Sequence, residues 1–161
     1  AGGIADTGSV FFNIIEAVQT TVDGLGLDGS PSVIIRKVPV DQGLGLDEDV
    51  TFPVIVVAPW KDAMPLASGT DSADDIVYSV IVLSIMGDDR EGTFTANLNR
   101  TLLWRQTIRR AFHHKPFGSV GHIGNVEAQL LEPVIREAWA AGLLASPLLL
   151  NFTSRETRGV A

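Results

Sequence analysis

Apolar residues recur at helical spacing near the start of the chain, between Ser9 and Leu25. The stripe consists of Val10, Phe11, Ile14, Ile15, Val18, Val22 and Leu25. Asn13, Glu16, Gln19, Thr20 and Asp23 fall on the other side. This period of about 3.6 residues predicts an amphipathic helix. Asp6, Thr7 or Ser9 can cap its start, and Gly24 and Gly26 end it.

Strand patterns follow the first helix. Residues 32–38 are rich in β-branched side chains, and residues 54–58 form a short apolar run between two prolines, which is typical of an edge strand. Residues 76–85 are almost continuously apolar, as expected of a strand at the centre of a covered sheet. Between these strands we expect long loops at about 39–49 and 59–75.

The second half begins with a helix over residues 97–114, which contain no Gly or Pro and are stopped by the Lys-Pro pair at 115–116. Strand-like alternation follows at 125–136, then a short helical or irregular piece at 137–145, and a closing strand at 147–156. The order α-β-β-β-α-β-β predicts an α+β domain. We expect one domain over residues 1–161, with two main helices on one face of a mixed or mostly antiparallel sheet.

Composition narrows the function. The absence of cysteine among 161 residues excludes thiolate zinc sites, iron–sulfur clusters and cysteine nucleophiles. Only 19% of residues are charged and the mean hydropathy is +0.24, which favours a chain that hides surface in an assembly. No run reaches the length of a membrane-spanning helix, and no basic residue precedes the first apolar ones, so we expect no secretory signal and synthesis in the cytoplasm.

Charge is divided along the chain. Residues 1–95 carry a net charge of −11 and residues 96–161 a net charge of +4. Two hypotheses explain this division equally well. In the first, it arises from acidic loops and chance. In the second, the acidic surface of one copy contacts the basic surface of the next copy.

Glycine motifs give no nucleotide site. GLGLD occurs at 24–28 and again at 43–47, and the first copy extends to a GxGxxG match. That match follows a helix and precedes a strand, which is the reverse of the dinucleotide-binding context. Turn chemistry explains both copies.

Metal and catalytic candidates are weak. The histidines are His113, His114 and His122, and the acidic sets are Asp71, Asp74, Asp75 and Asp88, Asp89, Glu91. Adjacent histidines point to different sides of a helix, and acidic residues in turns are usually solvated. We therefore predict no catalytic residue, no metal ligand and no cofactor.

The second helix is the most informative element. Its apolar face predicts core packing through Thr101, Trp104, Ile108, Ala111 and Phe112. A neighbouring stripe forms the candidate subunit interface, Leu98, Leu102, Arg105 and Arg109. With Arg100, Arg110 and Lys115 the helix carries five basic residues and no acid. Their partner is nucleic acid phosphate, the acidic loops of an adjacent copy, or solvent.

The order of these pieces resembles the tail-terminator proteins of long-tailed bacteriophages. The resemblance rests on VFFNIIEAVQTTV at 10–22, FPVIVVAP at 52–59, DDIVYSVIVLSIMG at 74–87, NRTLLWRQTIRRAF at 99–112 and PLLLNFTSRETR at 147–158. It implies a non-enzymatic virion protein, made in the host cytoplasm, that forms a hexameric ring. The ring ends growth of the tail tube and joins the tail to a head-tail connector or neck protein.

Such a ring lets duplex DNA pass without specific binding and has no membrane partner. Acidic side chains suit a DNA passage, and we expect some of the following to face the lumen or the tube end: Asp41, Asp47, Glu48, Asp49, Asp71, Asp74 and Asp75. Three alternatives stay open. They are a head-completion or other neck-ring protein, a metal-dependent hydrolase that uses Asp71, Asp74 and Asp75 with a histidine, and a monomeric binding adaptor.

Overall fold

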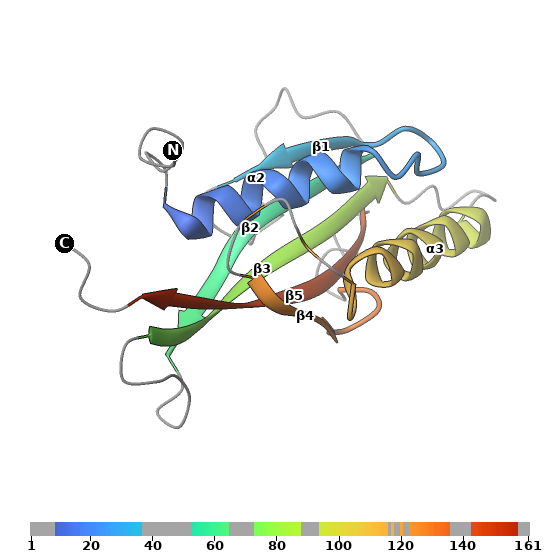
Figure 1. Cartoon of the computed structure of the whole chain (residues 1–161). Helices are drawn as coiled ribbons and strands as arrows, with labels where there is room; N and C mark the ends of the chain where they lie inside the picture. Colours follow the sequence, from blue (N-terminus) through green and yellow to red (C-terminus); the bar gives the residue numbers. More distant parts are fainter. Residues whose placement is uncertain are drawn as a thin grey trace.

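A computed structural model describes residues 9–36, 53–64, 73–87, 94–115, 117, 120, 123–135 and 143–157. Its elements are α2 (Val10–Asp23), β1 (Ser32–Ile35), β2 (Val54–Ala63), β3 (Ala73–Gly87), α3 (Phe94–Phe112), β4 (Ile123–Leu130) and β5 (Leu143–Thr157). The strands form one sheet in the order β1-β2-β3-β5-β4 (Figure 1). β1 runs parallel to β2 and the other neighbours are antiparallel, so the predicted α+β fold with a mixed sheet is confirmed.

α2 forms where the apolar stripe predicted it. Ser9 caps the helix, because its Oγ accepts a hydrogen bond of 3.0 Å from the backbone N–H of Phe12. Ile14, Ile15, Val18 and Val22 are buried against the sheet. Gly24 ends the helix, and its N–H donates to the carbonyl of Thr20.

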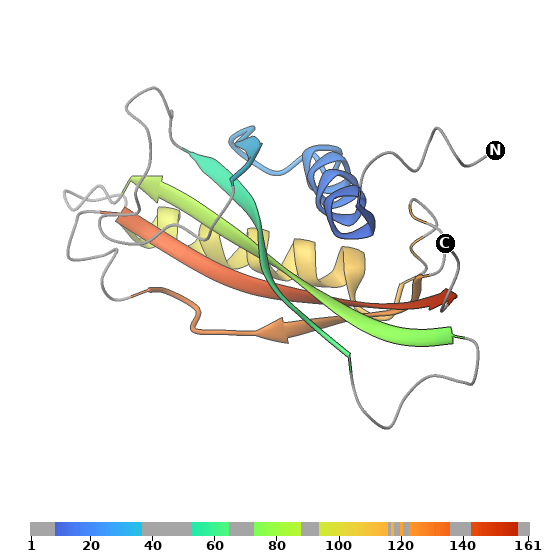
Figure 2. The same ribbon diagram turned by 90° about the vertical axis from the view of Figure 1, so that its left-hand side faces the viewer.

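Both helices pack on the same face of the sheet, as Figures 1 and 2 show. The main core lies between this face and the helices, and it includes Val18 of α2, Val57 of β2, Val80 of β3, Trp104 of α3 and Phe152 of β5. The loop after α2 ties the helices together, because Trp104 Nε1 donates to the carbonyl of Asp28 at 3.0 Å.

The other face of the sheet is also apolar. Buried residues there include Val56 of β2, Ile81 and Leu83 of β3, and Leu149 of β5. β3 is therefore buried on both faces, which explains its continuous apolar run and confirms its predicted central place.

The predicted loop at 59–75 is wrong at both ends. β2 continues through Pro59 to Ala63, with a register shift between Pro59 and Lys61. Proline is tolerated there because the parallel pairing with β1 ends at Val57, two residues earlier. At the other end β3 begins at Ala73, so Asp74 and Asp75 are strand residues rather than loop residues.

The irregular piece predicted at 137–145 also needs correction, since β5 begins at Leu143. The predicted loop at 39–49 lies outside the described residues. In the part of the chain that the structure describes, neither helix is long and apolar enough to cross a membrane.

Candidate functional site

The outer side of α3 carries exposed apolar side chains beside basic ones. Trp104, Ile108 and Phe112 are buried against the sheet, as the helical pattern predicted. On the other side Leu102 is 38% exposed and Leu103 is 46% exposed. A leucine pair on the outside of a helix leaves apolar area without cover in the single chain.

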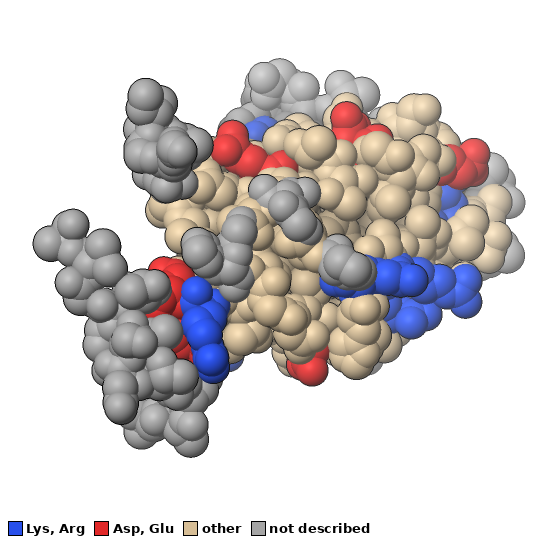
Figure 3. Space-filling model, in the orientation of Figure 1, with Lys and Arg blue, Asp and Glu red and all other residues tan. Residues whose placement is uncertain are grey.

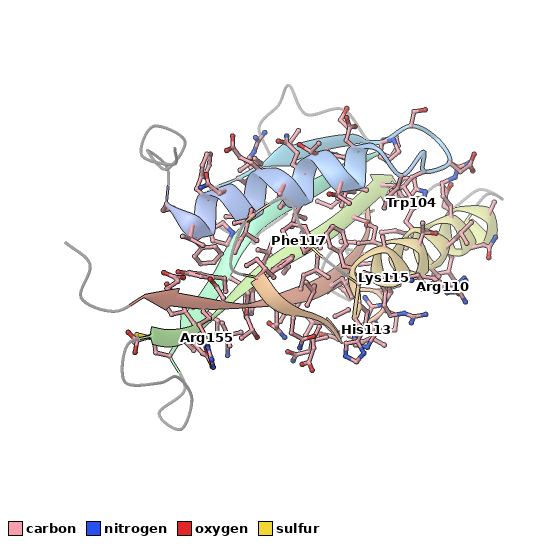
Figure 4. All side chains as sticks on the ribbon, viewed as in Figure 1. Trp104, Arg110, His113, Lys115, Phe117 and Arg155 are labelled. Atoms are coloured by element: carbon pink, nitrogen blue, oxygen red, sulfur yellow. The ribbon has the colours of Figure 1, made fainter. Side chains whose placement is uncertain are left out.

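Unpaired cations accompany these leucines. Residues 94–115 include five Lys and Arg side chains, and two of them have partners within the chain. Arg100 forms an ion pair with Asp28 at 3.1 Å, and Arg105 donates to backbone carbonyls. Arg109, Arg110 and Lys115 have no partner within the described ranges. Figure 3 shows basic side chains gathered over α3, and Figure 4 places Arg110, His113 and Lys115 near its C-terminal end.

Arg105, a member of the predicted interface stripe, is hydrogen-bonded inside its own chain. Its guanidinium donates to the carbonyls of Leu131, Glu132 and Pro147 and to the Oγ of Ser146, at 3.1 Å for the last. These groups border the point where the β4–β5 ladder stops, after the Leu130 and Leu148 pair. Burial lowers the pKa of Arg105 from its ordinary value, and the carbonyls compensate the buried charge. Arg105 therefore holds this chain together and is not a free cation.

The remaining members of the stripe differ in exposure. Leu102 is exposed, whereas Leu98 and Arg109 are half-buried. The sequence did not single out Leu103, because it lies outside both the core face and the predicted stripe. Its signal was an apolar residue on the far side of the helix from Trp104 and Ile108.

The C-terminal end of α3 is fixed to the edge strand β4. His113 Nδ1 accepts a hydrogen bond of 3.0 Å from the N–H of Ala128, and the N–H of His114 donates to the carbonyl of Val126 at 2.9 Å. The two imidazole rings stack with centroids 3.9 Å apart. Within the described residues no three His, Asp or Glu side chains gather as a metal site would require, and His122 lies outside them.

The described acidic candidates lie at the end of the long β3–β5 pair. Asp75 binds Arg155 through both oxygens, at 2.8 and 3.0 Å. Nearby, Tyr78 donates its O–H to Glu156 Oε2 at 2.7 Å, and burial together with this carboxylate raises the pKa of Tyr78. Both oxygens of Asp75, which the hydrolase alternative would use, are therefore already bound to Arg155. Asp41, Asp47, Glu48, Asp49 and Asp71 lie outside the described residues.

A second charged surface lies on α2. Glu16 and Asp23 are exposed, and residues 9–31 contain no Lys or Arg. Phe12, one turn before Glu16, is 46% exposed. Figure 3 shows acidic side chains over α2, on the same view as the basic ones over α3.

A groove of about 410 Å³ lies on the face of the sheet away from the helices. Its described lining is Trp60, Ile81, Leu83, Leu131, Glu132, Ile135 and Pro147. Among these residues Glu132 alone is ionisable, so the groove has no pair of groups for acid–base chemistry.

Comparisons with known proteins find similarity to solved structures, and this similarity is distant in sequence. No family model matches the chain, and no curated protein sequence matches it. A solved structure of a sheath/tube terminator, from an extracellular contractile injection system in its extended state, is similar with 8% sequence identity and a TM-score of 0.49. The match covers 97% of this chain and 60% of that protein, so this chain spans less than two thirds of its length.

Proposed function

We propose that this chain is a structural, non-enzymatic protein of a phage-type tail that assembles into a ring at the head-proximal end of the tail tube. There it ends tube growth and provides the surface on which a head-tail connector or neck protein docks. The observation that carries the proposal is the outer side of α3. There Leu102 and Leu103 are exposed beside Arg109 and Arg110, which no described residue pairs with. A surface that combines apolar area with arginine is typical of protein interfaces.

The order of elements supports the same proposal. The resemblance to tail terminators rests on two helices and three strands, and each of these elements is present in the expected order. The charge division adds to it, because a head-to-tail ring needs two different surfaces on each subunit.

Reconstruction of virions that carry this chain tests the proposal. We expect a closed ring with a central opening, located between the tail tube and the head connector. Disruption of the gene should give tubes of uncontrolled length and heads without tails. Tails of normal length joined to heads in its absence would contradict the role, as would a lone subunit on the capsid surface.

A further inference from the structure

We propose that the outer side of α2 in one copy docks on the outer side of α3 in the next copy. The acidic surface is defined by Phe12, Glu16 and Asp23, and the basic surface by Leu102, Leu103, Arg109 and Arg110. This inference rests on the proposed self-assembly and names the two surfaces that carry it out.

Charge selects the partner. Residues 9–31 hold three acids and no base, and residues 94–115 hold five bases and no acid. Arg100 pairs with Asp28, and the half-buried Arg105 binds backbone carbonyls of its own chain. Glu16 and Asp23 then remain on one helix, and Arg109 and Arg110 on the other. A contact of α3 with α3, or of α2 with α2, would place like charges together, which disfavours both. The contact between unlike helices is the one that pairs them.

The position of Asp23 adds an independent reason. It is the last residue of α2, where the helix dipole is negative, and no basic residue lies in that turn. An anion there is disfavoured, and a cation supplied from outside relieves it. Arg109 and Arg110 lie in the last turn of α3, where the dipole favours cations.

The apolar residues indicate how the helices run. On α2 the apolar Phe12 precedes Glu16 and Asp23, and on α3 Leu102 and Leu103 precede the arginines. Parallel helices therefore bring Phe12 onto the leucines and the acids onto the arginines. The helices are about 21 and 28 Å long at 1.5 Å per residue, so the contact can extend over the whole of α2.

The two surfaces border opposite edges of the sheet. α2 reaches the β1 edge, where Gln19 Nε2 donates to the carbonyl of Val33 at 3.0 Å. α3 ends on the β4 edge, where His113 binds Ala128. Because β1 and β4 are the outer strands, one copy can contact a neighbour at each side (Figures 1 and 2).

A charge exchange between two variants tests the pairing. One variant carries Arg109→Glu and Arg110→Glu, and the other carries Glu16→Arg and Asp23→Arg. Each alone should weaken self-association about tenfold or more, because like charges then face each other. An equimolar mixture should restore it, since both surfaces of one variant are acidic and both surfaces of the other are basic. Lys61→Glu, an exposed reversal on β2, should leave association unchanged. Circular dichroism checks that every variant folds.

Cysteine pairs test the orientation, because the natural chain has no cysteine. A mixture of Phe12→Cys and Leu103→Cys chains, and one of Asp23→Cys and Arg110→Cys chains, should form crosslinked heterodimers. The crossed mixtures, Phe12→Cys with Arg110→Cys and Asp23→Cys with Leu103→Cys, should crosslink several-fold less. More crosslinking in the crossed mixtures would overturn the parallel arrangement.

The outcomes separate this inference from the proposed function. Virion rings that persist in both charge variants would overturn the docking surfaces and leave the ring intact. A wild-type chain that stays monomeric at every concentration, together with cysteine mixtures that give no crosslinks, would overturn the docking proposal, while virion reconstruction still judges the function. Loss of duplex DNA binding without any change in association, in the Arg109 and Arg110 variant, would assign the basic surface to nucleic acid instead.

Discussion

Arg105 is the residue on which two parts of the fold depend. Its guanidinium fills the place where the β4–β5 ladder stops, and it satisfies carbonyls that no strand neighbour reaches there. An unsatisfied buried carbonyl costs about 1–3 kcal/mol, so one side chain here prevents several such losses.

We predict that Arg105→Met lowers the free energy of unfolding by about 2–4 kcal/mol, because it keeps the aliphatic stem and removes every donor. Arg110→Met, an exposed matched change on the same helix, should stay within about 0.5 kcal/mol. Urea unfolding followed by circular dichroism measures both. Equal stabilities for the two variants would refute the role of Arg105.

Tyr78 makes the stability of the fold depend on pH. Its pKa is raised, first by burial and then by the hydrogen bond to Glu156. The folded chain thus holds the phenol proton more tightly than the unfolded chain does. The resulting stabilisation is complete below the unfolded pKa of about 10 and is lost as pH rises above it.

We predict that Tyr78→Phe costs about 1–2 kcal/mol at neutral pH through the lost hydrogen bond. The difference between wild type and variant should shrink above about pH 10, where the wild type alone must release this proton. Since the chain has one tyrosine, ultraviolet absorbance reports its titration directly. A phenol that titrates at its ordinary value in the folded chain would contradict the prediction.

At the scale of elements, the end of α3 protects an edge of the sheet. His113 and His114 bind backbone groups of Ala128 and Val126, so β4 is partly closed to other strands. His114 has a φ of 54°, the left-handed conformation that ends many helices.

We predict that His113→Ala destabilises the chain by about 1–2 kcal/mol, because the N–H of Ala128 loses its acceptor. His114→Asn should be nearly neutral, since asparagine tolerates a positive φ and the backbone hydrogen bond remains. Hydrogen exchange at Ala128 measures the local effect. Unchanged protection in the His113 variant would show that another group fills the acceptor's place.

Helices and strands could be predicted where a local pattern of side chains is enough to determine them. The stripe of α2 and the apolar run of β3 depend on local sequence, and both are present as predicted. The ends of β2, β3 and β5 depend on pairing between residues far apart, such as Asp75 with Arg155, and no local pattern contains that information. The role of Arg105 could not be predicted for the same reason. Its guanidinium binds the carbonyl of Leu131, 26 residues away in sequence, just after the β4–β5 pairing ends.

At the scale of the whole molecule, charge decides between the partners of α3. The chain carries a net charge of −7, and among the described residues nothing pairs with Arg109 or Arg110 of α3 or with Lys115 just after it. Each phosphate contact contributes about −0.9 to the slope of log affinity against log salt. A surface with three such cations is too small for tight DNA binding and large enough for a protein contact.

We predict that duplex DNA binds weakly at physiological salt, with a slope no steeper than about −3 when it is measured at low salt. Arg110→Ala should reduce the slope by about one, because one phosphate contact is removed. Fluorescence anisotropy of a labelled duplex over a salt series measures both quantities, with Lys61→Ala as the control away from α3. A steeper slope with tight binding at physiological salt would mean that α3 faces nucleic acid. In that case the expectation of a DNA passage lined by acidic side chains would be wrong. The basic surface of α3 would also not be the partner of α2 in the next copy.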